Sequence, residues 1–264
     1  MNTTGKVLRY DLRDLIRSRW LIGYALFFAL LTDALVRFGG SGEKALLSLV
    51  SVTLFVVPLV GLVFGTVYVY NAREFTELLL AQPVTRRQLF GGLYLGLALA
   101  LSLGFALGVG VPFVVEGGLA GPSARAPFAV LLLTGIALTW VFSAAAFLVA
   151  THTEDRLKGL GMAIAAWLGA TVLYDGLVLV AVMMLGDYPI ERPMLAVMFA
   201  NPVDLARVLL LLQFDASALM GYTGAVFKDF FTGAPGALVA ATALGLWIAA
   251  PVALGLRAFQ RKDF

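Results

Sequence analysis

The sequence predicts an all-α integral membrane protein, a single transmembrane domain over residues 1–264 with six spanning helices and an interfacial helix before the first of them. Three observations predict this class. Apolar residues make up 61% of the chain and charged residues 13%, where soluble globular chains have about 45–50% and about 25%. Six segments are long and apolar enough for a bilayer core, which needs about 20 residues per helix. The Lys and Arg residues gather on alternate connections between those segments.

The six predicted spans are separated by polar connections. We interpret the first as a retained span and not as a signal peptide, because charged residues precede it and no small residues mark a cleavage site at its end. The third and fifth are long, which suggests tilt or projection beyond the bilayer. The spans cover residues 20–36, 45–69, 89–115, 127–150, 159–186 and 235–256.

The charge distribution sets the predicted orientation. One side, with the N-terminus, the tail and the connections after the second and fourth spans, carries 13 of the 19 Lys and Arg residues. Because positively charged connections stay in the cytoplasm, we expect both termini to be cytoplasmic. Residues 4–19 are basic but have apolar residues at helical spacing, which favours a helix lying in the interface against anionic lipid. The simpler alternative is a basic flank that only orients the first span.

The segment 195–214 is apolar at both ends, but we do not count it as a span. Asp204 and Arg207 would together cost about 5–7 kcal/mol at a helix centre. We interpret residues 187–233 as an outer-face segment that contains short helices. Asn201 would cap one of them and Pro202 would occupy its first turn, and that helix is either interfacial or re-entrant.

The composition excludes several function classes. The absence of cysteine excludes disulfides, thiolate catalysis and cysteine-ligated metals, and a single histidine, His152, excludes a multi-histidine metal site within one chain. No lysine is followed by Ser or Thr, so the chain has no Walker A loop and cannot be its own P-loop ATPase. The net charge of +3 does not indicate nucleic-acid binding, since the basic residues lie at helix ends. We expect no catalytic residue, metal site or cofactor in this chain.

The connection at residues 71–88 is the most informative stretch. Gln82 and Pro83 would end a short helix, because the residue before a proline avoids the helical region, and Thr85 would cap the next helix. Three consecutive leucines at positions 78–80 favour a docking surface over an ordinary solvated connection.

The pattern from Glu74 to Arg86 resembles the cytoplasmic loop of ABC-2 type transporter permeases. That family usually has acidic residues, then Gly-Thr, Glu-Leu-Leu and Pro-x-Ser/Thr-Arg, and here Phe75 stands where glycine is usual. The resemblance implies an ABC-2 permease fold, of the type V exporter kind, in which this loop is a coupling helix that docks on a separate ATPase. By this resemblance the ATPase-coupling residues are Arg73, Glu74, Thr76, Glu77, Leu78, Leu79, Pro83, Thr85 and Arg86.

A second stretch is similar to those ABC-2 permeases that serve maturation of the copper-containing nitrous oxide reductase. It consists of Asp175 in the fifth span and the outer residues Asn201, Pro202, Asp204 and Arg207. The resemblance implies two permease copies in a bacterial inner membrane, an ATPase dimer that holds ATP and Mg²⁺, and a periplasmic β-helical protein in contact with the outer residues. Asp175 is either part of a transmembrane path or subunit interface, or a hydrogen-bonded structural carboxylate.

Four other polar positions have simpler interpretations. Asp33 and Arg37 should form a surface pair at i,i+4 spacing, and Glu116 should be solvated. His152 should be solvated too, since a metal site needs three or four ligands. The methionines are soft donors for copper, but they more often fill gaps between apolar helices. Gly104 and Gly108 form a small-residue pair that allows another helix to approach closely.

Other functions remain open at this point. An ABC-2 exporter with another cargo, lipid-like or a small molecule, would have the same layout. A secondary transporter or channel would usually show more polar residues within its spans. An intramembrane enzyme would need clustered catalytic groups that the spans lack. The sequence does not identify the cargo or distinguish a homodimer from a heterodimer.

Overall fold

The computed structural model describes residues 12, 14–15, 17–39, 42–80, 84–185, 196–214 and 234–261. Every regular element in these ranges is a helix, and six stretches are long and apolar enough to cross a membrane. The six predicted spans fall on these helices, which confirms the fold class. They are α2 (Arg19–Phe38), α3 (Gly42–Asn71), α5 (Arg86–Val115), α6 (Pro122–His152), a fifth stretch over Arg156–Met184, and α12 (Ala234–Arg261).

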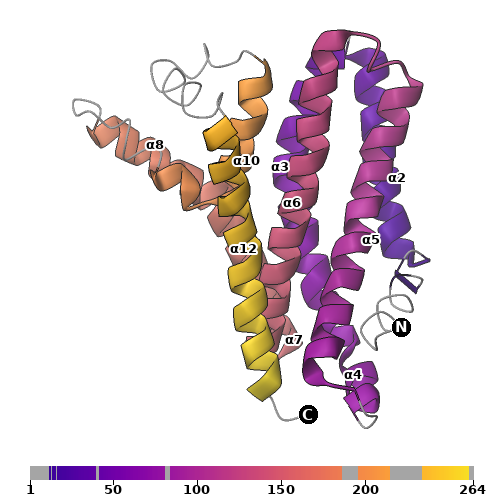
Figure 1. Cartoon of the computed structure of the whole chain (residues 1–264), viewed down its shortest axis with the longest axis vertical. Coiled ribbons are helices and arrows are strands. Elements are labelled where there is room, and N and C mark those ends of the chain that lie inside the picture. The colour runs from indigo at the N-terminus through magenta and orange to yellow at the C-terminus, as the bar shows by residue number, and fades with distance from the viewer. Residues whose placement is uncertain are drawn as a thin grey trace.

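The fifth stretch is made of three parts. It begins as α7 (Arg156–Leu168), passes through the π-helix η1 (Gly169–Leu173) and continues as α8 (Tyr174–Leu185). Figure 1 shows α8 leaving the bundle at an angle, and none of the residues 174–184 is buried.

Three shorter elements connect the spans. The helix α4 (Arg73–Leu80) lies between α3 and α5, and α10 (Pro202–Leu211) is followed by the 3₁₀ turn η2 (Leu212–Phe214). The helix α10 is too short to be a span. The interfacial helix expected at 4–19, and the parts of 187–233 outside 196–214, lie almost wholly outside the described residues.

The two predicted helix starts are confirmed by their capping geometry. The Thr85 hydroxyl accepts a hydrogen bond from the Gln88 backbone N–H at 3.4 Å, and the Gln88 side chain accepts one from the Thr85 N–H at 3.3 Å. This reciprocal capping box satisfies two N–H groups that have no partner inside the helix. At α10 the Asn201 side chain accepts from the Val203 N–H at 2.9 Å, with Pro202 in the first turn.

The centre of the bundle is formed by α3, α5 and α6, with α2 packed on α5 and α12 packed on α6 (Figure 1). Aromatic side chains join these helices edge to face. The rings of Phe28 and Phe105 lie 5.1 Å apart, and those of Phe90 and Phe147 lie 5.3 Å apart. Because lipid is as apolar as these side chains, close packing rather than exclusion from water holds the helices together in a bilayer.

The glycines of α5 allow the close contact with α2, as the small-residue spacing predicts. A Cβ atom added at Gly104 would lie 3.1 Å from Leu21 Cδ1. At Gly108 it would lie 2.7 Å from the Ala25 backbone oxygen and 2.9 Å from Phe28 Cβ. The two helices therefore meet at backbone distance here.

Gly108→Ala should therefore destabilise the helix bundle, because neither the Ala25 carbonyl nor the Phe28 Cβ can move without shifting α2. We expect a loss of about 1–3 kcal/mol, as overpacking usually costs. The matched control is Gly110→Ala on the same helix, where a Cβ would meet nothing within 4 Å. Thermal unfolding in detergent measures both variants, and equal midpoints would show that α2 and α5 are not closely packed at Gly108.

Candidate functional site

The helix α4 lies at the end of the bundle where α2 begins and α12 ends (Figure 1). Glu74, Glu77 and Leu78 are all exposed, and their spacing places them on one face of α4. Leu78 is 70% exposed, whereas Leu79 and Leu80 are half-buried and pack against the bundle core. Of the three leucines expected to form a docking surface, only Leu78 is fully exposed, because successive helical residues point in different directions; the docking role stays a prediction. We call Glu74, Glu77 and Leu78 the α4 face.

The α4 face is held in place by a clamp at the start of α4. The Arg73 guanidinium donates to the backbone oxygens of Glu154 at 2.8 Å and Thr153 at 3.0 Å. It also lies over the ring of Tyr70, with Cζ 4.4 Å from the ring centroid. The Tyr70 hydroxyl donates to the backbone oxygens of Thr153 at 3.0 Å and Asp155 at 3.3 Å. The junction of α3 and α4 is therefore bonded to the connection between α6 and α7.

The other predicted coupling residues surround the same helix. Thr76 is buried at the base of α4, with 3% of its surface exposed, and Thr85 caps α5. Arg86 donates to the backbone oxygen of Gln260 at 2.7 Å, which bonds the start of α5 to the end of α12. Pro83 lies outside the described residues. The loop thus joins α3, α5, α7 and α12 at one end of the bundle, and its role in ATPase coupling stays a prediction.

A second cluster joins α8 to α10. Arg207 donates to Asp175 at 2.6 Å and to Asp204 at 2.9 Å, so that one guanidinium serves two carboxylates. The side chains of Arg207 and Asp175 are each 34% exposed, and that of Asp204 is 13% exposed. The second oxygen of Asp175, Oδ1, is buried and bonds to none of the described residues. We call these three residues the Arg207 triad.

The Arg207 triad has one more acidic group than basic groups. Loss of hydration on burial raises the pKa of Asp204, which lies outside the six spans, to about 7, and the neighbouring Asp175 adds to this while Arg207 opposes it. The triad can therefore take up a proton near neutral pH, which would leave one carboxylate facing one guanidinium. Of the two interpretations of Asp175, the structural one now has a defined partner, and the functional one stays a prediction.

Beside the triad, Asn201 joins α10 to the π-helix. Its amide Nδ2 donates to the backbone oxygen of Ala170 in η1 at 2.7 Å while its Oδ1 caps α10. The Tyr174 hydroxyl donates to the Val197 backbone oxygen just before α10. Asn201 and Pro202 are buried within the chain. A contact between either of them and an outer partner would need this segment to rearrange, so that role stays a prediction.

Comparison with known proteins identifies the family. Residues 6–264 match the sequence profile described as ABC-2 family transporter protein. The chain belongs to the ABC-2 transporter family. It is therefore a multi-pass membrane subunit of an ABC transporter, as the loop from Glu74 to Arg86 predicts, and the family implies an ABC ATPase partner.

Two relatives of this ABC-2 permease carry the same name. The probable ABC transporter permease protein NosY of Pseudomonas aeruginosa is 30% identical over 277 aligned positions, which cover 97% of each chain. The protein of that name from Stutzerimonas stutzeri is 27% identical over 234 positions, which cover 82% of the permease and 84% of the relative.

The remaining polar positions of the permease are exposed or partly exposed. Arg37 pairs with Asp33 at 3.0 Å, as the i,i+4 spacing predicts. Glu116 is partly exposed, and its carboxylate also accepts from Arg37 at 2.8 Å, which joins α2 to the end of α5. His152 is exposed and bonds to the Leu148 backbone oxygen at 3.0 Å. Within the described ranges no group of three or more acidic or histidine side chains could hold a metal ion.

Sequence reasoning missed three groups at these sites: the backbone oxygens of Thr153 and Glu154, the η1 carbonyl of Ala170, and the ring of Tyr70. The two sets of backbone oxygens leave no mark in the sequence. Tyr70 offers a weak signal, since it lies at the end of a span three residues before Arg73, where a tyrosine often faces the interface.

Proposed function

We propose that this permease is the NosY-like subunit of a transporter that serves maturation of the copper enzyme nitrous oxide reductase in the bacterial inner membrane. Two copies of the permease would pair on a NosF-like ATPase dimer, which holds the ATP and Mg²⁺. A NosD-like periplasmic protein would contact the outer side. The full-length similarity to two proteins named NosY supports this proposal.

The α4 face carries the proposed coupling role. Glu74, Glu77 and Leu78 offer two negative charges and an apolar side chain on a short helix that projects at one end of the bundle. This end is the predicted cytoplasmic side, where an ATPase would dock. An apolar centre with charges beside it is a common composition for a protein interface, in which the charges set orientation and association rate.

The contacts define a route for the movement. A push on α4 acts through the Arg73 clamp on the connection before α7. The helix α7 leads into η1, to which Asn201 bonds at 2.7 Å, and the Arg207 triad joins α8 to α10 beyond it. ATP-driven closure of the ATPase dimer would therefore reach the outer segment, which would gate a cargo or signal to the periplasmic partner.

Co-purification with stoichiometry tests the proposal. We would extract the tagged permease from its native membrane in mild detergent and identify bound subunits by mass spectrometry. A Walker-A-bearing subunit in equal copies, together with a β-helical periplasmic protein, is the expected result. An ATPase without the β-helical protein would assign the permease to another cargo. A permease that purifies alone and stable would overturn the ATPase-coupled function.

A further inference from the structure

A groove of about 1510 Å³ runs between α2 and α3. Most of its lining is apolar, from Trp20, Tyr24 and Phe27 on α2 to Leu59 and Phe64 on α3. None of the Arg207 triad lines it, and of α4 it includes Phe75 and no residue of the α4 face. The groove is therefore a separate feature from the two sites described above.

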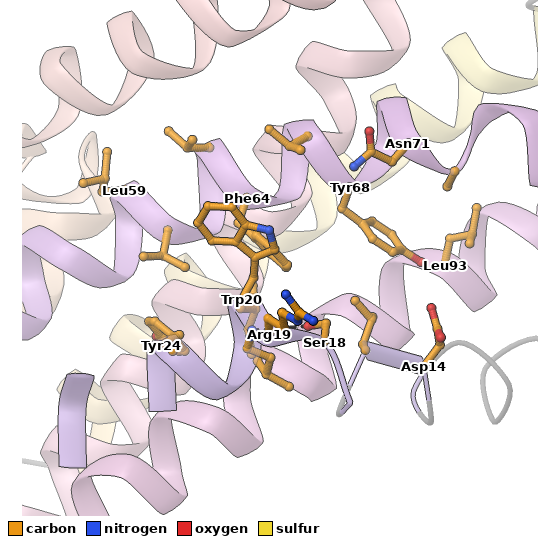
Figure 2. Close-up of a pocket in the computed structure, with 18 of the residues that line it drawn as sticks. Asp14, Ser18, Arg19, Trp20, Tyr24, Leu59, Phe64, Tyr68, Asn71 and Leu93 are labelled. Atoms are coloured by element: carbon orange, nitrogen blue, oxygen red, sulfur yellow. Dashed lines mark hydrogen bonds between the residues drawn. The ribbon is translucent and has the colours of Figure 1, made fainter. Parts of the chain in front are cut away.

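The polarity of the groove changes along its length. Figure 2 shows Asp14 and Asn71 toward one end and Leu59 and Tyr24 toward the other, with Trp20 between them. The polar end is the one where α2 begins and α3 ends, which is the α4 end of the bundle. The apolar end stops near Val56, in the middle of α3. An occupant would therefore have a polar head at the membrane surface and an apolar body inside.

The length of the groove is that of one leaflet. Val56 and Asn71 are fifteen residues apart on α3, which corresponds to about 22 Å at the helical rise of about 1.5 Å per residue. Half of a bilayer, headgroups included, is about 20–22 Å thick. A helix from a second copy would need an apolar surface across the whole core, about 30 Å, whereas a groove of one leaflet, headgroups included, spans only about 15 Å of that core.

The polar end carries two cations, Arg19 and Arg156, that form no ion pair with the described residues. They line the groove at the first turns of α2 and α7, and both are exposed. Guanidinium groups are well suited to phosphate, because they offer several N–H donors in one plane. Asp14 lies at the same end, where it can meet an ammonium group. Trp20, 77% exposed, is the kind of residue that lies at headgroup depth.

We propose that this groove binds one phospholipid from the leaflet on the α4 side, with its phosphate on Arg19 and Arg156 and an acyl chain along α2 and α3. The lipid is a bound component of the permease. Phe75, on the same helix as Glu74 and Glu77, lines the polar end of the groove, so the headgroup end of the lipid also supports the position of α4. This inference does not depend on the identity of the ATPase or the cargo, because lipid binding can be measured on the permease alone.

Lipid retention tests the proposal on the purified full chain. After extensive detergent washing, extracted phospholipid is quantified per permease by mass spectrometry, and rebinding of a fluorescent phosphatidylethanolamine is titrated. We expect about one retained phospholipid per chain, and a roughly tenfold weaker rebinding in Arg19→Gln/Arg156→Gln, from the loss of two charge-assisted contacts. The matched control is Arg87→Gln/Lys158→Gln, which removes two exposed cations from the same end that do not line the groove.

A second variant separates lipid binding from charge alone. Leu59→Trp adds volume at the apolar end and leaves both arginines in place, so it should also reduce retention, and a single size-exclusion peak would show that it folds. Equal retention and rebinding in all variants would overturn the proposal. So would efficient cross-linking of two copies through Leu59→Cys in the washed permease, since a second copy would then fill the groove.

Discussion

Arg207→Leu is expected to destabilise the joint between α8 and α10 more than the loss of any other ion pair among the described residues. The substitution leaves Asp175 and Asp204 facing one another without their shared cation. Removing one partner of a fully buried pair costs about 3–5 kcal/mol. Because about a third of the Asp175 side chain is exposed, we expect about 2 kcal/mol here. Thermal unfolding in detergent measures the loss, and ATPase stimulation by the reconstituted complex should fall with it.

The matched control removes the whole triad. In Arg207→Leu with Asp175→Asn and Asp204→Asn, no unpaired charge remains, so stability should return most of the way to that of the wild type. A lasting loss of ATPase stimulation in this stable variant would assign the triad a role in transport. If Arg207→Leu alone unfolds at the wild-type temperature, the three side chains do not form an ion cluster in the membrane.

The second large effect is expected from reversing both acidic charges of the α4 face, in Glu74→Lys/Glu77→Lys. Both side chains are exposed and neither forms an ion pair with a described residue, so the permease should insert and fold normally. Exposed charge pairs contribute up to about 1 kcal/mol each, and reversal replaces attraction by repulsion. We therefore expect ATPase docking to weaken by at least about tenfold.

Pull-down of the ATPase and its hydrolysis rate in reconstituted complexes measure this change. Glu43→Lys, an exposed charge reversal at the opposite end of α3, is the control and should leave both unchanged. Unchanged stimulation in the double variant would show that the ATPase docks elsewhere on the permease.

The parts of the structure that could be predicted from sequence are those that depend on neighbouring residues. Each span follows from a long and mainly apolar run, and the caps at Thr85 and Asn201 follow from residues two or three positions away. The exposed α4 face was predictable in position but not in detail, since Leu79 and Leu80 turn toward a core that only the folded chain provides.

The pairings between helices could not be predicted in the same way. Arg207 lies 32 residues from Asp175, and Arg37 lies 79 residues from Glu116. The sequence offers several oppositely charged residues as possible partners for each of these side chains. Only the packing of the helices decides which of them forms the ion pair. The π-helix η1 is equally hidden, because the residues Gly169–Leu173 would also suit an ordinary α-helix.

The π-helix η1 lies directly before α8, so a change of angle at η1 would move the whole of α8. The helix α8 has twelve residues, so it extends about 18 Å beyond η1 at the helical rise of about 1.5 Å per residue. A pivot of about 10° at η1 would displace its far tip by about 3 Å, as simple geometry requires. The Arg207 triad and Asn201 join α10 to the fifth span at or beside η1. A movement of α10 would therefore act close to the pivot. A small rotation at this joint would thus move the tip of α8 by a larger distance.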